Sequence, residues 1–85
     1  MDILLIEDNQ TITKGLTYTF STTNYNLVSA SSIEEAKQIL TTKILKLILL
    51  DVTLPDGNGF DLYEEKIKIL NIPTIFLTAK DTEDD

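Results

Sequence analysis

The chain has 85 residues, a mass of 9.6 kDa, and neither cysteine nor histidine. This length allows one small domain, and the two missing residue types exclude disulfide frameworks, zinc sites and catalysis by histidine or cysteine. All seven basic residues are lysines, and against 14 acidic residues they leave a net charge of −7. Because an anionic chain without arginine binds phosphate backbones poorly, we expect no direct contact with nucleic acid or anionic membranes.

Hydrophobic residues make up 42% of the chain, which is typical of a folded domain rather than a disordered one. The apolar run from Ile3 to Ile6 is too short for a signal peptide and is followed by acidic residues. No stretch reaches the ~20 apolar residues of a membrane span. We therefore predict a cytoplasmic domain.

A strand and a helix are predicted at the start of the chain. Residues 2–6 form a short apolar run that stops at polar residues, which is typical of a strand buried on both faces. Asn9 is a candidate N-cap for a helix over residues 10–22, where apolar residues recur at helical spacing. A second strand is predicted over residues 27–30, and a second helix over residues 33–43.

The second half of the chain repeats this alternation. Residues 47–50 form the most apolar run of the sequence and predict a third strand. A turn-rich loop over residues 53–59 then precedes a third amphipathic helix over residues 60–70. We expect Asn71 to end that helix and residues 74–78 to form a fourth strand.

Local signals mark the start of the second and third helices. Ser31–Ser32 lies three residues before Glu34–Glu35, which is a doubled capping-box pattern. Gly57 and Gly59 are predicted turn residues, because glycine permits positive φ and a tight entry into a helix. These signals favour ordered connections between the elements.

The alternation of four strands with three helices predicts an α/β fold. Its short connections favour right-handed crossovers into a parallel sheet, which needs helices on both faces and so forms a three-layer sandwich. Three helices are few for four strands. We therefore expect residues 1–85 to be a truncated domain, in which a further helix and strand would follow the fourth strand.

Polar residues follow three of the predicted strands. Glu7 and Asp8 follow the first, Asp51 ends the third, and Thr78 ends the fourth. Because parallel strands share one carboxyl edge, where ligands of open α/β sheets bind, we expect these residues to meet there. The alternative is that loops are polar and acids are common in this chain.

Three close carboxylates indicate a cation site. They repel one another, so one of them takes up a proton unless a cation neutralises the cluster. Oxygen ligands without histidine or cysteine select a hard cation, and Mg²⁺ suits an open pocket of three acids. A carboxylate beside Mg²⁺ can act as a nucleophile toward a phosphoryl group, and Asp51 is the candidate.

Three motifs together resemble the receiver domain of a bacterial response regulator. They are Glu7-Asp8, the run Asp51-Val52-Thr53-Leu54-Pro55-Asp56-Gly57-Asn58-Gly59-Phe60, and Thr78-Ala79-Lys80, and their order and spacing match over essentially the whole chain. The resemblance implies a flavodoxin-like sandwich and a role in two-component signalling. The sequence from Leu54 to Asp61 most resembles receivers of winged-helix transcriptional regulators. The resemblance therefore implies an output that controls transcription.

The same resemblance implies roles for the acidic residues. Asp51 would accept a phosphoryl group from a sensor histidine kinase, and the domain itself would not be an enzyme. Mg²⁺ would be bound by Asp8 directly, by Glu7 mostly through water, by Asp51, and by the backbone carbonyl of Thr53.

The resemblance also concerns the end of the chain. Thr78 would be the switch hydroxyl that turns toward the phosphate, and the Ala79 amide would lie nearby. Receivers of this kind continue through a fourth helix, a fifth strand that carries a catalytic lysine, and a fifth helix. We find none of these in the sequence, and Lys80 does not occupy the place of that lysine.

Two other functions fit parts of the pattern. An aspartyl-phosphate phosphatase of the haloacid dehalogenase type also uses an aspartate after an apolar strand, but it needs a second acid where Thr53 stands. It also gives no reason for Glu7-Asp8. A receiver-like interaction module that signals without phosphate is the second alternative.

The open edge of the fourth strand leads us to expect self-association. Without a further strand it would leave an open edge with unpaired N–H and C=O groups, which pairs readily with another chain. We therefore expect a homodimer, or a swapped or edge-paired assembly, through residues 74–78.

Overall fold

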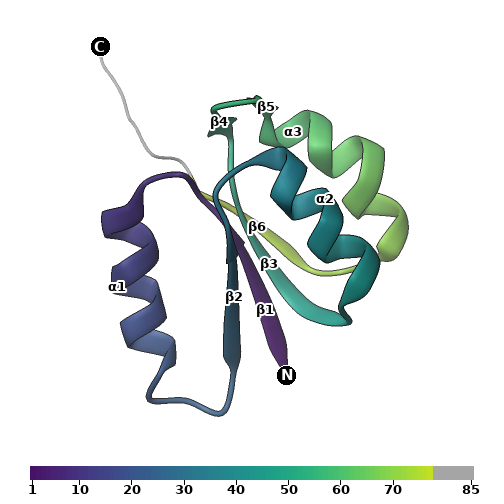
Figure 1. Cartoon of the computed structure of the whole chain (residues 1–85). Coiled ribbons are helices and arrows are strands. Elements are labelled where there is room, and N and C mark those ends of the chain that lie inside the picture. The colour runs from purple at the N-terminus through teal and green to yellow at the C-terminus, as the bar shows by residue number, and fades with distance from the viewer. Residues whose placement is uncertain (78–85) are drawn as a thin grey trace.

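The computed structural model describes residues 1–77, which form a parallel sheet between helices (Figure 1). The strands and helices occur in the predicted order, and their ends differ from the prediction by at most two residues, apart from the helical segment and the hairpin described below. The elements are β1 (Asp2–Ile6), α1 (Gln10–Phe20), β2 (Asn26–Ala30), α2 (Ile33–Thr42), β3 (Leu45–Asp51), β4 (Thr53–Leu54), β5 (Gly57–Asn58), α3 (Gly59–Leu62), the π-helical turn η1 (Tyr63–Ile67), the 3₁₀ turn η2 (Lys68–Leu70) and β6 (Thr74–Leu77).

The main sheet has the strand order β2-β1-β3-β6, and all of its pairs are parallel. At the carboxyl end of the sheet, Ile6 lies between Ala30 and Leu50, and Asp51 lies opposite Leu77. The chain winds from β1 outward to β2 and then returns to the other side of β1 for β3. The position between β1 and β3 is therefore the switch point, where open α/β sheets bind ligands.

Helices cover both faces of this sheet, which confirms the predicted three-layer sandwich. Figure 1 shows α1 on one side and α2 with α3 on the other. Successive strand residues point to opposite faces, so β1 and β3 contribute to two separate cores. The core on the α1 side contains Ile3, Leu5 and Leu49, with Leu16 and Phe20 packed against it. The larger core on the other side contains Leu4, Ile6, Ala30, Ala36, Leu45, Ile48, Leu50, Leu54, Leu62 and Ile67.

The third helical segment is continuous but is not the regular α-helix that the sequence predicts. A four-residue α-helix passes into a π-helical turn and then a 3₁₀ turn, and Asn71, with φ 57° and ψ 35°, ends the segment as expected. Leu62 and Ile67 are both fully buried although they are five positions apart in the sequence. The wider π turn places residues five apart on one face, so both side chains reach the core.

The predicted loop over residues 53–59 contains a small antiparallel hairpin, which the sequence analysis missed. Thr53 pairs with Asn58 and Leu54 pairs with Gly57. The side chain of Leu54 is buried in the larger core. Leu54 is the buried residue of a hairpin whose other residues are exposed.

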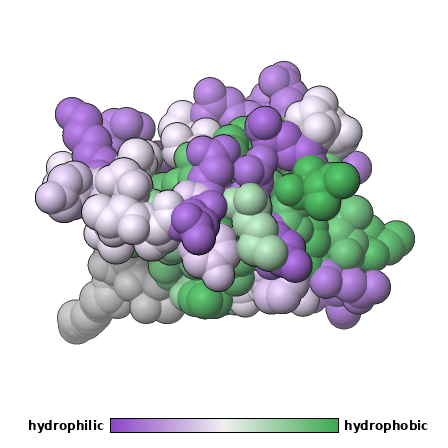
Figure 2. Space-filling model, turned by 90° about the horizontal axis from the view of Figure 1, so that it is seen from below, coloured by the Kyte–Doolittle hydropathy of each residue, from purple (hydrophilic) through white to green (hydrophobic). Residues whose placement is uncertain are grey.

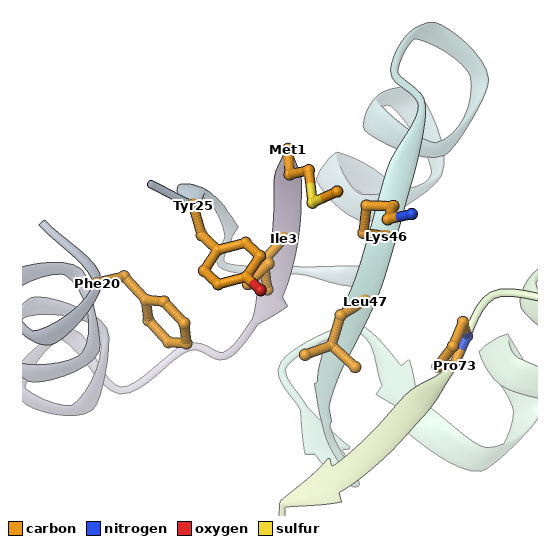
Figure 3. Close-up of a pocket in the computed structure, with 7 residues that line it drawn as sticks. All are labelled: Met1, Ile3, Phe20, Tyr25, Lys46, Leu47 and Pro73. Atoms are coloured by element: carbon orange, nitrogen blue, oxygen red, sulfur yellow. The ribbon is translucent and has the colours of Figure 1, made fainter. Parts of the chain in front are cut away.

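The α1 side of the sheet is only partly covered by the described residues. A cavity of about 470 Å³ opens near the amino ends of the strands. Figure 2 looks at the molecule from this end and shows hydrophobic residues gathered mainly on the right of the view, away from α1. Figure 3 shows the residues that line the cavity, which come from β1 and β3, from the positions just before β1, β2 and β6, and from the end of α1. They are Met1, Ile3, Phe20, Tyr25, Lys46, Leu47 and Pro73.

Candidate functional site

Three carboxylates meet at the carboxyl edge of the sheet, at its switch point. Glu7, Asp8 and Asp51 each offer one carboxylate oxygen, and these oxygens all lie within 4.8 Å of one another. Glu7 and Asp51 are buried, each with 3% of its surface exposed, whereas Asp8 is open to solvent. The prediction that these side chains converge is confirmed.

Asn9 holds the acidic end of β1 in place. Its side-chain oxygen accepts hydrogen bonds from the backbone N–H groups of Thr11 at 2.9 Å and Ile12 at 3.1 Å, so it is the predicted N-cap of α1. Its own backbone N–H donates to Glu7 Oε2 at 3.0 Å. The backbone N–H of Glu7 donates to the Ala30 carbonyl at 2.9 Å and so extends the sheet. Hydrogen bonds therefore fix both the backbone and the carboxylate of Glu7.

The backbone at Asp51 is packed closely against the start of α3. A Cβ atom on Gly59 would overlap the carbonyl oxygen of Asp51, and the Gly59 N–H donates to the Val52 carbonyl at 2.6 Å. Gly59 has no positive φ, and it provides the tight entry into the helix that the sequence also predicts, through this close approach. Gly57 does have a positive φ, of 156°.

The pKa of Glu7 is raised above its ordinary value. Burial of the carboxyl group is the main cause, and the nearby charges of Asp51 and Asp8 act in the same direction. The hydrogen bond from the Asn9 N–H opposes the shift. The ionised cluster is therefore costly on its own and favours a cation beside it.

The donor set fits Mg²⁺. Its ligands are oxygens only, and the exposure of Asp8 leaves room for the waters and phosphate oxygens that Mg²⁺ keeps. Thr53 lies two residues beyond Asp51, in β4, and the role of its carbonyl stays a prediction. Thr78 and Ala79 lie outside the described residues.

The sequence analysis missed the contact between Asp56 and the start of α2. Its carboxylate accepts hydrogen bonds from the backbone N–H groups of Ile33 at 2.8 Å and Glu34 at 3.0 Å, in the first turn of α2. The sequence presents this residue only as part of a Pro-Asp-Gly turn. Nothing in a local pattern indicates a partner more than 20 residues away.

Comparisons with known proteins identify relatives of this chain. Residues 3–85 match the family model described as the response regulator receiver domain. The chain is 39% identical to the swarming motility regulation protein RssB of Serratia marcescens, over 95% of this chain and 37% of that protein. It is 36% identical to the alkaline phosphatase synthesis transcriptional regulatory protein PhoP of Bacillus subtilis, over 98% of this chain and 35% of that protein.

A solved structure has the same fold. The non-phosphorylated receiver domain of HemR from Leptospira biflexa matches with a TM-score of 0.84 and 36% identity, over 96% of this chain and 67% of that one. The chain thus spans little more than a third of the curated relatives and about two thirds of this solved domain. In residues 1–77, no helix is long and apolar enough to cross a membrane.

Proposed function

Since the chain belongs to the response regulator receiver family, we propose that it is the phosphoacceptor part of a two-component response regulator. In this proposal Asp51 receives a phosphoryl group from a sensor histidine kinase. The observation that carries it is the convergence of Glu7, Asp8 and Asp51 at the switch point of the sheet. Acids that hold a metal ion beside a nucleophilic carboxylate supply the positioning and the charge stabilisation on which phosphoryl transfer relies.

The chemistry follows from the positions of the three acids. A carboxylate oxygen of Asp51 forms a bond to phosphorus while the bond from phosphorus to the donor's histidine nitrogen breaks, and that nitrogen keeps the electron pair. Asp8, Asp51 and the Thr53 carbonyl would hold Mg²⁺, and Glu7 would do so through water. When bound, Mg²⁺ supplies the positive charge that offsets the carboxylates and the phosphoryl oxygens. Glu7, Asp8 and the Thr53 carbonyl form no bond to phosphorus in this step, because only Asp51 is the nucleophile.

The rest of the proposal concerns the longer protein. Thr78 would contact the phosphate on Asp51, together with the Ala79 amide. We also propose that the output of the longer protein is control of transcription. The support for this is the relative PhoP, which is named as a transcriptional regulatory protein. We place the protein in the cytoplasm and assign it no enzymatic turnover of its own. The haloacid dehalogenase alternative has no support, because Thr53 occupies the place of its second acid.

Self-association through β6 is also part of the proposal. Among residues 1–77, β6 pairs with β3 along one edge and has no partner along the other. Ile75 is 52% exposed, and Leu77 packs on the α1 side, which is the face that holds the open cavity. A second copy that pairs with this edge would cover both the unpaired backbone groups and the apolar surface.

The test of the proposed function is phosphorylation of Asp51. In the complete response regulator, acetyl phosphate with Mg²⁺ should give a hydroxylamine-labile acyl phosphate that the Asp51→Asn variant lacks. Asp61→Asn, which changes an acid in the first turn of α3, is the matched control and should label normally. Undiminished label in Asp51→Asn would exclude this assignment. A folded, Mg²⁺-loaded wild type that takes no label would favour the module that signals without phosphate.

A further inference from the structure

The β4–β5 hairpin connects Asp51 to the start of α3 and carries Thr53. At its base, the Gly59 N–H bonds to the Val52 carbonyl, and Gly59 lies against the Asp51 carbonyl. On one strand, Leu54 is buried in the larger core. The tip of the hairpin has neither of these attachments, since it consists of exposed turn residues.

Asp56 attaches this tip to α2. Its two carboxylate oxygens accept from two successive backbone N–H groups, of Ile33 and Glu34, at 2.8 Å and 3.0 Å. Such paired bonds to an ionised group are strong, and the pKa of Asp56 is lowered, first by the N–H of Ile33. The positive end of the α2 dipole favours the same charge.

Ser32 lies at the same helix end but makes a different kind of contact. Its hydroxyl accepts from the Glu35 N–H at 3.2 Å, so it caps α2 without touching the hairpin. Asp56 and Ser32 therefore share one function, which is to satisfy the free N–H groups of α2. Of these two residues, only Asp56 also joins α2 to the segment that follows Asp51, where Gly57 lies against the side chain of Ile33.

We propose that Asp56 is a positioning residue, whose carboxylate clasps the hairpin to α2 and thereby holds the Thr53 carbonyl and Asp51 in the geometry that binds Mg²⁺. This inference rests on the proposed function, because it assigns the same three-acid centre as the Mg²⁺ site. Thermodynamic linkage makes the coupling reciprocal. Mg²⁺ at the centre should therefore strengthen the clasp, and loss of the clasp should weaken Mg²⁺ binding.

The first experiment is a Mg²⁺ titration of the chain, followed through backbone amide spectra. We expect Asp56→Ala to weaken Mg²⁺ binding by about tenfold, in the range found for residues that orient metal ligands. Asp56→Asn keeps one acceptor oxygen and should fall between this variant and the wild type. Ser32→Ala removes a cap from the same helix and should leave Mg²⁺ affinity unchanged.

The second experiment measures hydrogen exchange at the Ile33 and Glu34 amides. Mg²⁺ should slow their exchange in the wild type and in Ser32→Ala, and should have no such effect in Asp56→Ala. A cap that only stabilises α2 would not respond to Mg²⁺. Equal Mg²⁺ affinities for Asp56→Ala and Ser32→Ala, with wild-type binding intact, would overturn the clasp and leave the proposed function standing. A wild type that does not bind Mg²⁺ would overturn both.

Discussion

The buried carboxyl group of Glu7 opposes folding when it is ionised. It is buried beside Asp51, and its pKa is raised mainly because burial penalises the charged form. For an acid whose pKa is higher in the folded state, the folded state is favoured at low pH. Stability is then lost as the pH rises from the ordinary value of 4.5 through the folded value.

We expect Glu7→Gln to stabilise the metal-free chain at neutral pH and to weaken Mg²⁺ binding on the order of tenfold. The substitution keeps the size of the side chain and removes the buried charge. The gain in stability should disappear below about pH 4, where Glu7 is protonated in both states. Thermal unfolding in a chelating buffer at both pH values, with and without Mg²⁺, measures these effects. A variant less stable than the wild type at neutral pH without metal would contradict the account.

Gly59 and Gly15 should respond in opposite ways to the same substitution. A Cβ on Gly59 would overlap the Asp51 carbonyl oxygen, whereas a Cβ on Gly15 has no atom within 4 Å. Gly59→Ala should therefore cost about 1–3 kcal/mol, as overpacking typically does. Gly15→Ala, on the exposed side of α1, should add roughly 0.5–1 kcal/mol of stability. Urea unfolding of the two variants decides this, and the same sign for both would refute it.

At the scale of elements, the sequence predicts what depends on neighbours along the chain. The N-cap role of Asn9 and the left-handed stop at Asn71 follow from residue type and from the apolar spacing beside them. At α2, Ser32 caps the Glu35 N–H as the box pattern predicts, and the Glu35 carboxylate in turn accepts from the N–H of Ser31.

The elements that could not be predicted depend on distant partners. The π turn exists because Leu62 and Ile67 must both reach one core, and the hairpin exists because Leu54 enters that core. The clasp made by Asp56 depends on where α2 begins, which only the assembled sheet decides. The site differs from these elements. The convergence of Glu7, Asp8 and Asp51 could be predicted, because the carboxyl ends of parallel strands share one edge of the sheet.

At the scale of the whole molecule, the two faces of the sheet differ in how well they are covered. α2 and the helical segment from α3 to η2 lie on one face, and among residues 1–77 only α1 lies on the other. The cavity lined by Ile3, Leu47 and Pro73 lies on this second face, at the end of the sheet far from the carboxylates (Figure 3). Ile75 lies on the same face as Leu77, because alternate strand residues share a side.

This asymmetry leads to a prediction about assembly. If a second copy pairs with β6, a lysine at the middle of that edge should prevent it, since a desolvated charge cannot be accommodated there. Ile75→Lys should therefore be monomeric at micromolar concentration, where the wild-type chain is a dimer or larger. Ile69→Lys is the matched control, because Ile69 is 80% exposed on η2, away from the edge, and this variant should assemble like the wild type.

Light scattering gives the mass of each species, and circular dichroism verifies that the variants fold. Each substitution replaces one exposed isoleucine of the same chain by lysine. A general gain in solubility would therefore lower the measured mass of both variants equally. Dissociation of Ile75→Lys alone assigns the interface to the open edge of β6. A wild-type chain that is a stable, cooperatively folding monomer would show that the edge stays unpaired in solution, and the proposed assembly would then be wrong.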